Sequence, residues 1–407
     1  MAKIFRLIAW FIGITLGLLA LFILISLLVY PSEYVYRALA WRETDYTDFM
    51  EHFPMRKLFA ASEKFYFRES LEEDRVSGIF EQLSGTTDFE SLLEAENTQA
   101  FIVIQDDKIL YEKYLNGTQR DTLLTSFSVA KSYDSALIGS AIADGYLKSI
   151  DDPITDYLPE MLERDPRFQN VTIRHLLLMA SGFEYKEMRW GLLNGDDPLT
   201  SYYPDQRQAA LEFTKILDSP GEYFLYNKYH PQLLGLILER STGKTVTEYM
   251  QEKIWSPLGT EFDGSMSLDS ESSSFEKMET GVNARAIDYA KLGRLYLKNG
   301  EWEGEQLLPK SWIQESITID RENHNAEYYP DEFGQIIYDF LGGYYKYMWY
   351  GYTREGEDPD FAAEGDQGQF IYVSPHKNLI LVRNATAYGH LLGEDWIKLF
   401  YQFATEF

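Results

Sequence analysis

The strongest hydrophobic pattern in the chain is a run from residue 7 to residue 30 that contains no charged side chain. A run of this length can cross a bilayer as an α-helix, whereas the apolar core of a cleaved signal peptide is normally shorter. Lys3 and Arg6 precede the run, and positive residues mark the cytoplasmic end of a membrane span. We therefore predict an uncleaved membrane anchor over residues 1–30, with the rest of the chain outside the cytoplasm.

A charged and mixed stretch over residues 31–94 follows, which we interpret as a juxtamembrane segment, and the pattern of a folded domain covers residues 95–407. Two β-rich runs, 101–105 and 108–115, flank a pair of aspartates, as the strands of a hairpin would. Because hairpins imply antiparallel pairing, both ends of the domain are expected in one antiparallel sheet. The later strand-like runs are residues 344–350, 369–373 and 379–384.

The middle of the domain has helical periodicity instead. Residues 183–222 interrupt it with several prolines and glycines and are expected to form loops over one face. The predicted fold class is therefore α/β (of the α+β type), with an antiparallel sheet built from both chain ends, flanked by helices, a mostly helical insertion and an N-terminal transmembrane helix. The helical segments are residues 125–145, 171–179, 231–243, 246–254, 285–299 and 394–403.

Composition narrows the choice of partners. The net charge of −27 is spread along the chain, which argues against nucleic acid because binding phosphates needs a basic surface. There is no cysteine, so disulfides, thiolate metal sites and a cysteine nucleophile are excluded. No metal-binding spacing such as H-E-x-x-H is present. We therefore predict no metal, no cofactor and no nucleic-acid partner; the oligomeric state is left open.

Ser128 and Lys131 form the spacing S-x-x-K near the start of an otherwise apolar helix. Residues three apart are neighbours on one helix face, so the amine of Lys131 can reach the hydroxyl of Ser128. A serine hydroxyl needs a base to become a nucleophile, and a neutral, buried lysine can be that base. The spacing alone also arises by chance in a chain this long, but an amine in an apolar helix is costly without a purpose.

A catalytic serine also needs a proton carrier for the leaving group and an oxyanion hole. Tyr226 lies in a turn just before the helix at 231–243 and is followed closely by Lys228, a cation that would lower the pKa of the phenol. A glycine-containing stretch with Gly365 precedes the strand at 369–373, where the backbone can approach a ligand closely.

The histidines offer a competing interpretation, a Ser-His-Asp triad. Only six histidines are present and no G-x-S-x-G elbow occurs. His175 lies in an apolar helix and is interpreted as structural. His230, two residues after Lys228, is a candidate for lining the cleft, and His390 is a further candidate for a pocket residue.

These motifs occur in a characteristic order: S-V-A-K-S, then T-I-R-H-L-L-L-M-A-S-G-F, then P-G-E-Y-F-L-Y-N-K, then G-x-x-G-Q ending at Gln369. Over residues 95–407 the chain resembles the serine β-lactamase-related superfamily. More narrowly, it is similar to the branch of class C β-lactamases and 6-aminohexanoate-dimer hydrolases. That branch includes esterases and D-alanyl-D-alanine peptidases, and the resemblance implies a serine hydrolase.

The resemblance also implies roles for individual residues. Ser128 matches the nucleophile that becomes acylated, and Lys131 matches the lysine that activates it. Tyr226 matches the tyrosine that relays a proton to the leaving group and later activates water. Residues 363–365 fall at the K-T-G-like triplet, which assigns the oxyanion hole to the N–H groups of Ser128 and Asp366; Gly365 and Gln369 are expected near the substrate.

Two departures from the family pattern bear on the substrate. Lys228 stands where the Y-x-N motif has asparagine, so the usual amide contact is lost and a second cation could instead bind a carboxylate. The triplet lacks the lysine and threonine that hold the carboxylate of β-lactams, which favours a small ester or amide over penicillin. The prediction is a membrane-anchored ester or amide hydrolase. The alternatives are a catalytically weak binding or sensor protein of the same fold, and a D-alanyl-D-alanine peptidase.

Overall fold

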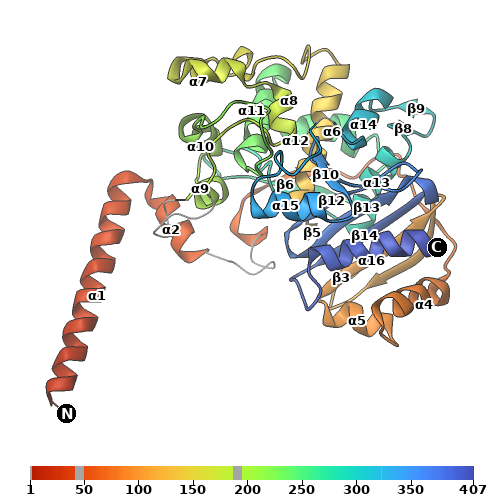
Figure 1. Ribbon diagram of the computed structural model, residues 1–407, viewed down its shortest axis with the longest axis horizontal. Helices are drawn as coiled ribbons and strands as arrows, with labels where there is room; N and C mark the ends of the chain where they lie inside the picture. Colours follow the sequence, from red (N-terminus) through yellow and green to blue (C-terminus); the bar gives the residue numbers. More distant parts are fainter. Residues whose placement is uncertain (1, 42–49, 187–194, 322) are drawn as a thin grey trace.

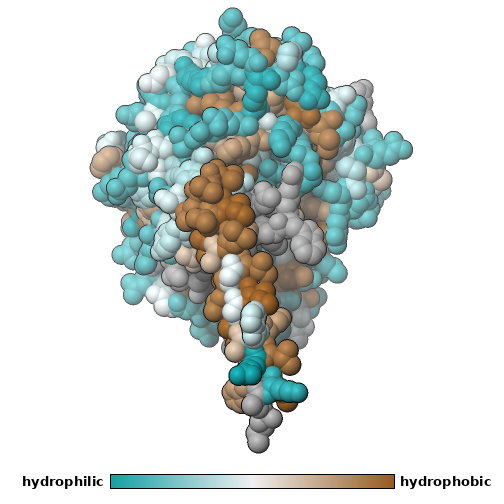
Figure 2. Space-filling view, turned by 90° about the vertical axis from the view of Figure 1, so that its left-hand side faces the viewer, coloured by the Kyte–Doolittle hydropathy of each residue, from teal (hydrophilic) through white to brown (hydrophobic). Residues whose placement is uncertain are grey.

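The computed structural model describes residues 2–41, 50–186, 195–321 and 323–407. It is a mixed α/β structure, as predicted, from which helix α1 (Ala2–Val29) projects to one side (Figure 1). The segment Lys3–Val29 is long and apolar enough to span a membrane, criteria that a signal sequence near an N-terminus also meets. Figure 2 shows α1 as a mostly hydrophobic column in front of a largely hydrophilic domain. A second, short helix, α2 (Ser32–Ala40), follows directly.

The main sheet joins the two ends of the chain. Strand β14 pairs antiparallel with β3, and β3 continues into β4 through Asp106 and Asp107, which both have positive φ. One short strand, β2, pairs parallel to β4, so the sheet is not wholly antiparallel. The order is β10-β11-β12-β13-β14-β3-β4-β2. The strands are β2 (Arg68–Glu69), β3 (Thr98–Gln105), β4 (Lys108–Tyr114), β10 (Gly343–Lys346), β11 (Trp349–Tyr352), β12 (Asp360–Gly365), β13 (Gln369–Ser374) and β14 (Leu379–Ala385).

Helices cover both faces of this sheet (Figure 1). On one face, Phe80 of α4 (Glu73–Ser84) stacks on Phe403 of α16 (Gly393–Glu406), with ring centroids 4.4 Å apart. On the other, α13 (Ala286–Leu297) packs so closely at Gly293 that an added Cβ would lie 2.9 Å from Ile371. The helix α5 (Phe89–Ala95) joins the first face.

A second, four-stranded sheet has the order β1-β6-β7-β5. Its strands are too short for a period-2 pattern to reveal, so sequence periodicity did not predict it. Its importance is positional, because β5 leads straight into the segment that carries Ser128. The strands are β1 (Met55–Leu58), β5 (Leu124–Thr125), β6 (Gly264–Ser267) and β7 (Val282–Ala284).

Two helices, α9 (Asp196–Tyr202) and α10 (Gln206–Phe213), lie within the region expected to be loops. Both are short, and prolines and glycines around them conceal their periodicity. The part of that region at 187–194 lies outside the described residues. The other helices are α6 (Ala130–Ala143), α7 (Pro159–Arg164), α8 (Ile173–Leu177), α11 (Tyr229–Thr242), α12 (Val246–Met250), α14 (Lys310–Ile317) and α15 (Glu332–Asp339); β8 (Glu301–Trp302) and β9 (Glu305–Gln306) form a hairpin. Of these helices, α7, α14 and α15 were not predicted either.

The aromatic run predicted as one strand at 344–350 is instead a hairpin, in which β10 pairs with β11. The turn is made by Tyr347 and Met348, at φ 44° and 66°. Neither residue type signals a turn, and the aromatic pattern continues across it, so the prediction of a single strand was wrong. The hydroxyl of Ser132 on α6 donates to the Met348 carbonyl at 2.7 Å, which ties this turn to the helix.

Candidate active site

Ser128 lies in a single 3₁₀ turn, Phe127–Val129, immediately before α6 begins at Ala130. Phe127 adopts a φ of 44°, in the left-handed region. Such a conformation costs a non-glycine residue about 1–3 kcal/mol and persists only where the surrounding structure enforces it. Here β5 on one side and the buried helix α6 on the other fix the turn, so the Ser128 hydroxyl is held by strained backbone rather than by regular helix.

The amine of Lys131 lies 2.8 Å from the Ser128 hydroxyl oxygen, within hydrogen-bond distance. The same amine donates to the backbone carbonyl of Glu279 at 2.9 Å. Lys131 is 1% exposed, so bulk water does not compete for these two hydrogen bonds. A candidate general base must first be within reach of the proton it removes, and Lys131 meets that condition.

Tyr226 completes the group, since its ring centroid lies 5.0 Å from the Lys131 amine. Two other aromatic rings contact it, those of Phe333 on α15 at 5.3 Å and Tyr345 on β10 at 6.2 Å. The structure therefore brings together Ser128, Lys131 and Tyr226, which come from two places in the chain about a hundred residues apart.

Gly365, the last residue of strand β12, lies close to the backbone of Ser126 and Ser128. A Cβ added at Gly365 would lie 2.4 Å from the Ser126 carbonyl oxygen and 3.1 Å from the Ser128 amide nitrogen. Any side chain here would therefore push the strand away from that amide. Asp366 follows at the surface, where its carboxylate accepts from the Gln367 amide at 2.8 Å.

Lys228 is already paired with a carboxylate. Its amine forms an ion pair with Asp197 of α9 and lies 3.4 Å from the Ser201 hydroxyl. Burial alone would lower the pKa of Lys228, but the Asp197 carboxylate, with smaller contributions from Glu279 and Tyr226, raises it above its ordinary value. The ion pair thus connects the turn that carries Tyr226 to α9. Because Asp197 already neutralises Lys228, the amine is not free to bind a carboxylate of the substrate.

His230 and Gln369 are occupied elsewhere. The His230 ring lies 2.6 Å from the Ser181 hydroxyl, and burial lowers the pKa of this histidine to about 3. The Gln369 amide donates to the Ala385 carbonyl at 2.6 Å. Both side chains are therefore hydrogen-bonded to groups other than Ser128, and their place near the substrate stays a prediction.

The two remaining histidines of interest have simple environments. His175 accepts from the Thr172 backbone amide in the capping box of α8, which agrees with its interpretation as structural. The side chain of His390 is 92% exposed and lies 3.4 Å from Glu96. Within the described ranges, no group of three or more His, Asp or Glu side chains is arranged to hold a metal ion.

Sequence reasoning missed two buried features beside the site. Lys277 and Glu279 form an ion pair at 2.7 Å with both side chains 1% exposed, and the backbone of this Glu279 holds Lys131. Asp134, one turn after Lys131 on α6, is fully buried, and burial holds the pKa of its carboxyl well above the ordinary value. A charged residue in an apolar helix was a visible signal for Asp134; nothing in the pattern signalled the Lys277–Glu279 pair.

A sheet covered by helices, with a serine and a buried lysine meeting beside a tyrosine, defines the class of β-lactamase-fold hydrolases. The chain belongs to the Beta-lactamase family, whose model matches residues 89–390. This confirms the predicted superfamily and identifies the protein as a member of a family of serine hydrolases.

Several hydrolases are similar to this chain in sequence or in structure. A 6-aminohexanoate-dimer hydrolase of Paenarthrobacter ureafaciens is 24% identical over 314 residues, covering 73% of this chain and 74% of its own. Esterase EstB of Burkholderia gladioli is 29% identical over 188 residues, 42% of this chain and 47% of its own. A Bacillus anthracis structure assigned to the 6-aminohexanoate-dimer hydrolases has a TM-score of 0.71 at 21% identity, covering 90% of this chain and 95% of its own. A class C β-lactamase has a TM-score of 0.58 at 14% identity, covering 82% and 97%. The two structures share the fold.

Proposed function

We propose that the protein hydrolyses an ester or small amide through an acyl-enzyme on Ser128. The observation that carries this proposal is the 2.8 Å separation between a buried lysine amine and the serine hydroxyl, in a chain of the Beta-lactamase family. A nucleophile and its base within hydrogen-bond distance are the minimum requirement for covalent catalysis by serine.

In the proposed reaction, Lys131 in its neutral form takes the hydroxyl proton as the Ser128 oxygen attacks the substrate carbonyl carbon. The resulting oxyanion accepts from the N–H groups of Ser128 and Asp366, and donors of this kind typically contribute about 10²–10³-fold to the rate. Tyr226 carries a proton to the leaving group, which departs as the carbonyl re-forms. The phenolate left on Tyr226 then takes a proton from water, whose oxygen attacks the acyl-enzyme. As the acid product leaves, Lys131 returns its proton to Ser128.

The walls of the site favour an apolar substrate. Ala363 takes the place of the family's lysine and is fully buried, so no cation from the triplet meets a substrate carboxylate. On the other side, Phe333 and Ile336 of α15 are each 41% exposed, and the Phe333 ring contacts Tyr226. Exposed apolar side chains beside a polar reaction centre are typical of a ligand site. An ester or amide with an apolar acyl or alcohol group fits these walls.

We also propose that α1 anchors the protein in a membrane with the hydrolase domain outside the cytoplasm. The support is the apolar span Lys3–Val29, with Lys3 and Arg6 at its N-terminal end. In intact cells, an impermeant protease should degrade the domain without lysis. Protection of the domain until lysis would reject this orientation.

Hydrolysis itself can be measured with p-nitrophenyl esters of short and medium acyl chains. We expect turnover by the intact protein and none by Ser128→Ala at equal folded concentration. A protein that binds these esters without releasing p-nitrophenol would instead fit a non-catalytic binding or sensor role. Release of D-alanine from a muropeptide, at a rate exceeding that of ester cleavage, would favour a peptidase.

A further inference from the structure

Helix α2, which directly follows the membrane helix, docks on α9 of the catalytic domain (Figure 1). Tyr34 is fully buried there and its ring lies 5.5 Å from that of Tyr203, at the end of α9. Leu199 of α9 belongs to the same small apolar cluster. Burying a large side chain contributes about 1.5–3 kcal/mol, so α2 is held to the domain and is not a free tether.

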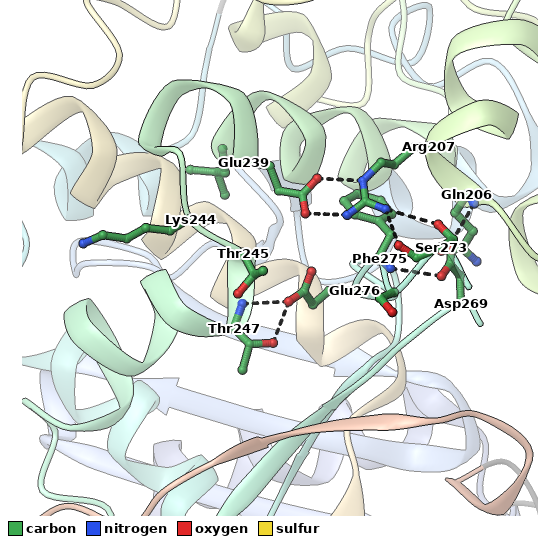
Figure 3. A network of polar contacts seen from close by, with 12 residues as sticks. Gln206, Arg207, Glu239, Lys244, Thr245, Thr247, Asp269, Ser273, Phe275 and Glu276 are labelled. Carbon is green, nitrogen blue, oxygen red and sulfur yellow. Dashed lines mark hydrogen bonds and ion pairs between the residues drawn. The ribbon is translucent and has the colours of Figure 1, made fainter. Parts of the chain in front are cut away.

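A buried arginine extends this contact inward. Arg37 of α2 is 4% exposed and its guanidinium donates to the Asp269 backbone carbonyl. The Asp269 carboxylate in turn accepts from the backbone amides of Gln206, at 2.8 Å, and Phe275, at 3.0 Å. Figure 3 shows Asp269 between Gln206 and Phe275. One carboxylate thus fixes both the start of α10 and the segment that leads to Glu279.

The same segment is held from a second side. Arg207 is paired with Glu239 of α11 through two hydrogen bonds and also donates to the Ser273 carbonyl at 2.7 Å. Further along, the Glu276 carboxylate accepts from the Thr247 hydroxyl at 2.7 Å. Figure 3 shows these contacts in one network. These contacts fix the segment at Ser273 and Glu276, so removal of Arg37 should act chiefly through Asp269, whose carbonyl Arg37 holds.

Helix α9 connects this network to the buried ion pair. Its last carbonyls have no partner within the helix, and side chains take their place: the Gln206 amide donates to the Thr200 carbonyl at 2.6 Å and the Lys277 amine to the Ser201 carbonyl at 2.9 Å. Both donors also reach the Glu279 carboxylate, Lys277 at 2.7 Å and Gln206 at 3.4 Å.

The contacts that run from Arg37 to Glu279 end at Lys131 and Ser128. The Glu279 backbone carbonyl accepts from the Lys131 amine at 2.9 Å, and this amine lies 2.8 Å from the Ser128 hydroxyl. We propose that α2 is a positioning element of the active site, with Arg37 as its key residue. Through Asp269, Gln206 and Glu279, α2 holds Lys131 at the distance needed to activate Ser128. This inference rests on the proposed acylation of Ser128.

The test uses the full-length protein in detergent micelles or nanodiscs and an alkyl fluorophosphonate, whose labelling gives a maximal rate kinact and a half-saturating concentration KI. We expect Arg37→Met and Tyr34→Leu to lower kinact about 3- to 30-fold, the range of coupling through packed networks, with KI unchanged. The matched control is Tyr36→Leu, on the same helix but 63% exposed, which should label at the normal rate.

A second control, Phe80→Leu, distinguishes a general loss of stability from a displacement of Lys131. Phe80 lies in the core, in α4, on the far face of the main sheet. The substitution should lower the unfolding midpoint yet leave kinact unchanged at a temperature where the protein is folded. A double-mutant cycle with Arg37→Met and Gln206→Met should be non-additive, because both act on one series of contacts.

If the unmodified protein does not label at all, the proposed function fails. If it labels, and Arg37→Met labels at the same kinact, the positioning role of α2 is wrong. Fully additive effects of Arg37→Met and Gln206→Met would likewise overturn the route through Gln206.

Discussion

At the scale of single residues, the reactivity of Ser128 depends on one buried amine and on the strained turn that presents the hydroxyl. Ser128, Lys131 and Tyr226 follow from residue types and motif order. The left-handed Phe127, which aims Ser128 out of a 3₁₀ turn, has no sequence signal, because phenylalanine is not a residue that favours positive φ. The Asp197 partner of Lys228 could not be predicted either, since only the fold brings α9 to that turn.

Replacing Lys131 by methionine should lower acylation of Ser128 by about 10²–10⁴-fold, the usual contribution of a positioned general base. Folding should be retained, because methionine occupies a similar volume and Lys131 forms no ion pair with any residue that the structure describes. The rate of fluorophosphonate labelling measures the reactivity of Ser128, and urea unfolding curves measure the stability of the variant. Labelling at the normal rate would exclude Lys131 as the base.

Gly365→Ala should lower kcat/KM for an ester by about 10²-fold or more, comparable to the loss of one oxyanion donor. The added methyl group would lie 2.4 Å from the Ser126 carbonyl oxygen and displace β12 from the Ser128 amide. Gly78→Ala in α4 is the control, because nothing lies within 4 Å of the added atom. Equal activity of both variants would contradict the close approach of β12.

Glu364 makes a pH-dependent prediction. Burial raises the pKa of its carboxyl to about 8 from an ordinary value of 4.5. Between these two pH values the folded state retains a proton that the unfolded state has lost, so the free energy of unfolding falls as pH rises.

Glu364→Gln removes this titration. The variant should match the parent at about pH 4 and exceed its stability by about 1 kcal/mol or more at about pH 9, since one pKa unit corresponds to 1.36 kcal/mol. Urea unfolding at the two pH values provides the measurement. A stability difference that is constant with pH would contradict the raised pKa.

At the scale of elements, most long periodic segments were predictable and most short ones were not, although the 12-residue α4 was missed. The hairpin of β3 and β4 and the helices α6, α11, α13 and α16 lie where the pattern placed them, because each repeats its period several times. Two-residue strands such as β5 show no period at all, and α9 and α10 are masked by neighbouring prolines. The β10–β11 turn was missed because Tyr347 and Met348 continue the aromatic pattern.

Helix α15 carries a prediction about substrate choice. Phe333→Ser should raise KM for a medium-chain ester several-fold while leaving that for an acetate ester nearly unchanged, because the exposed ring contacts Tyr226 beside the site. The free energy of unfolding should change by less than about 1 kcal/mol, since the ring is partly solvated. Phe59→Ser, at a side chain 60% exposed on the surface, is the control. A uniform change in KM across chain lengths would reject an apolar wall at α15.

At the scale of the whole molecule, the net charge and the N-terminal helices bear on which substrates reach the domain and how the domain is held. The net charge of −27 disfavours polyanionic substrates by repulsion, whereas the exposed Phe333 and Ile336 of α15 favour apolar ones. The sequence predicted an anchor, a charged segment and a domain. It could not predict that α2, in the charged segment, is packed on α9, because amphipathic helices of this length dock only through tertiary contacts.

The central claim is that Ser128 is the activated nucleophile, and the most direct measurement is intact-mass spectrometry of the protein after exposure to an alkyl fluorophosphonate, followed by peptide mapping. We predict one adduct per chain, on the peptide containing Ser128, and none on Ser128→Ala. An unmodified mass at saturating reagent, or an adduct of equal yield on Ser128→Ala, would contradict the account.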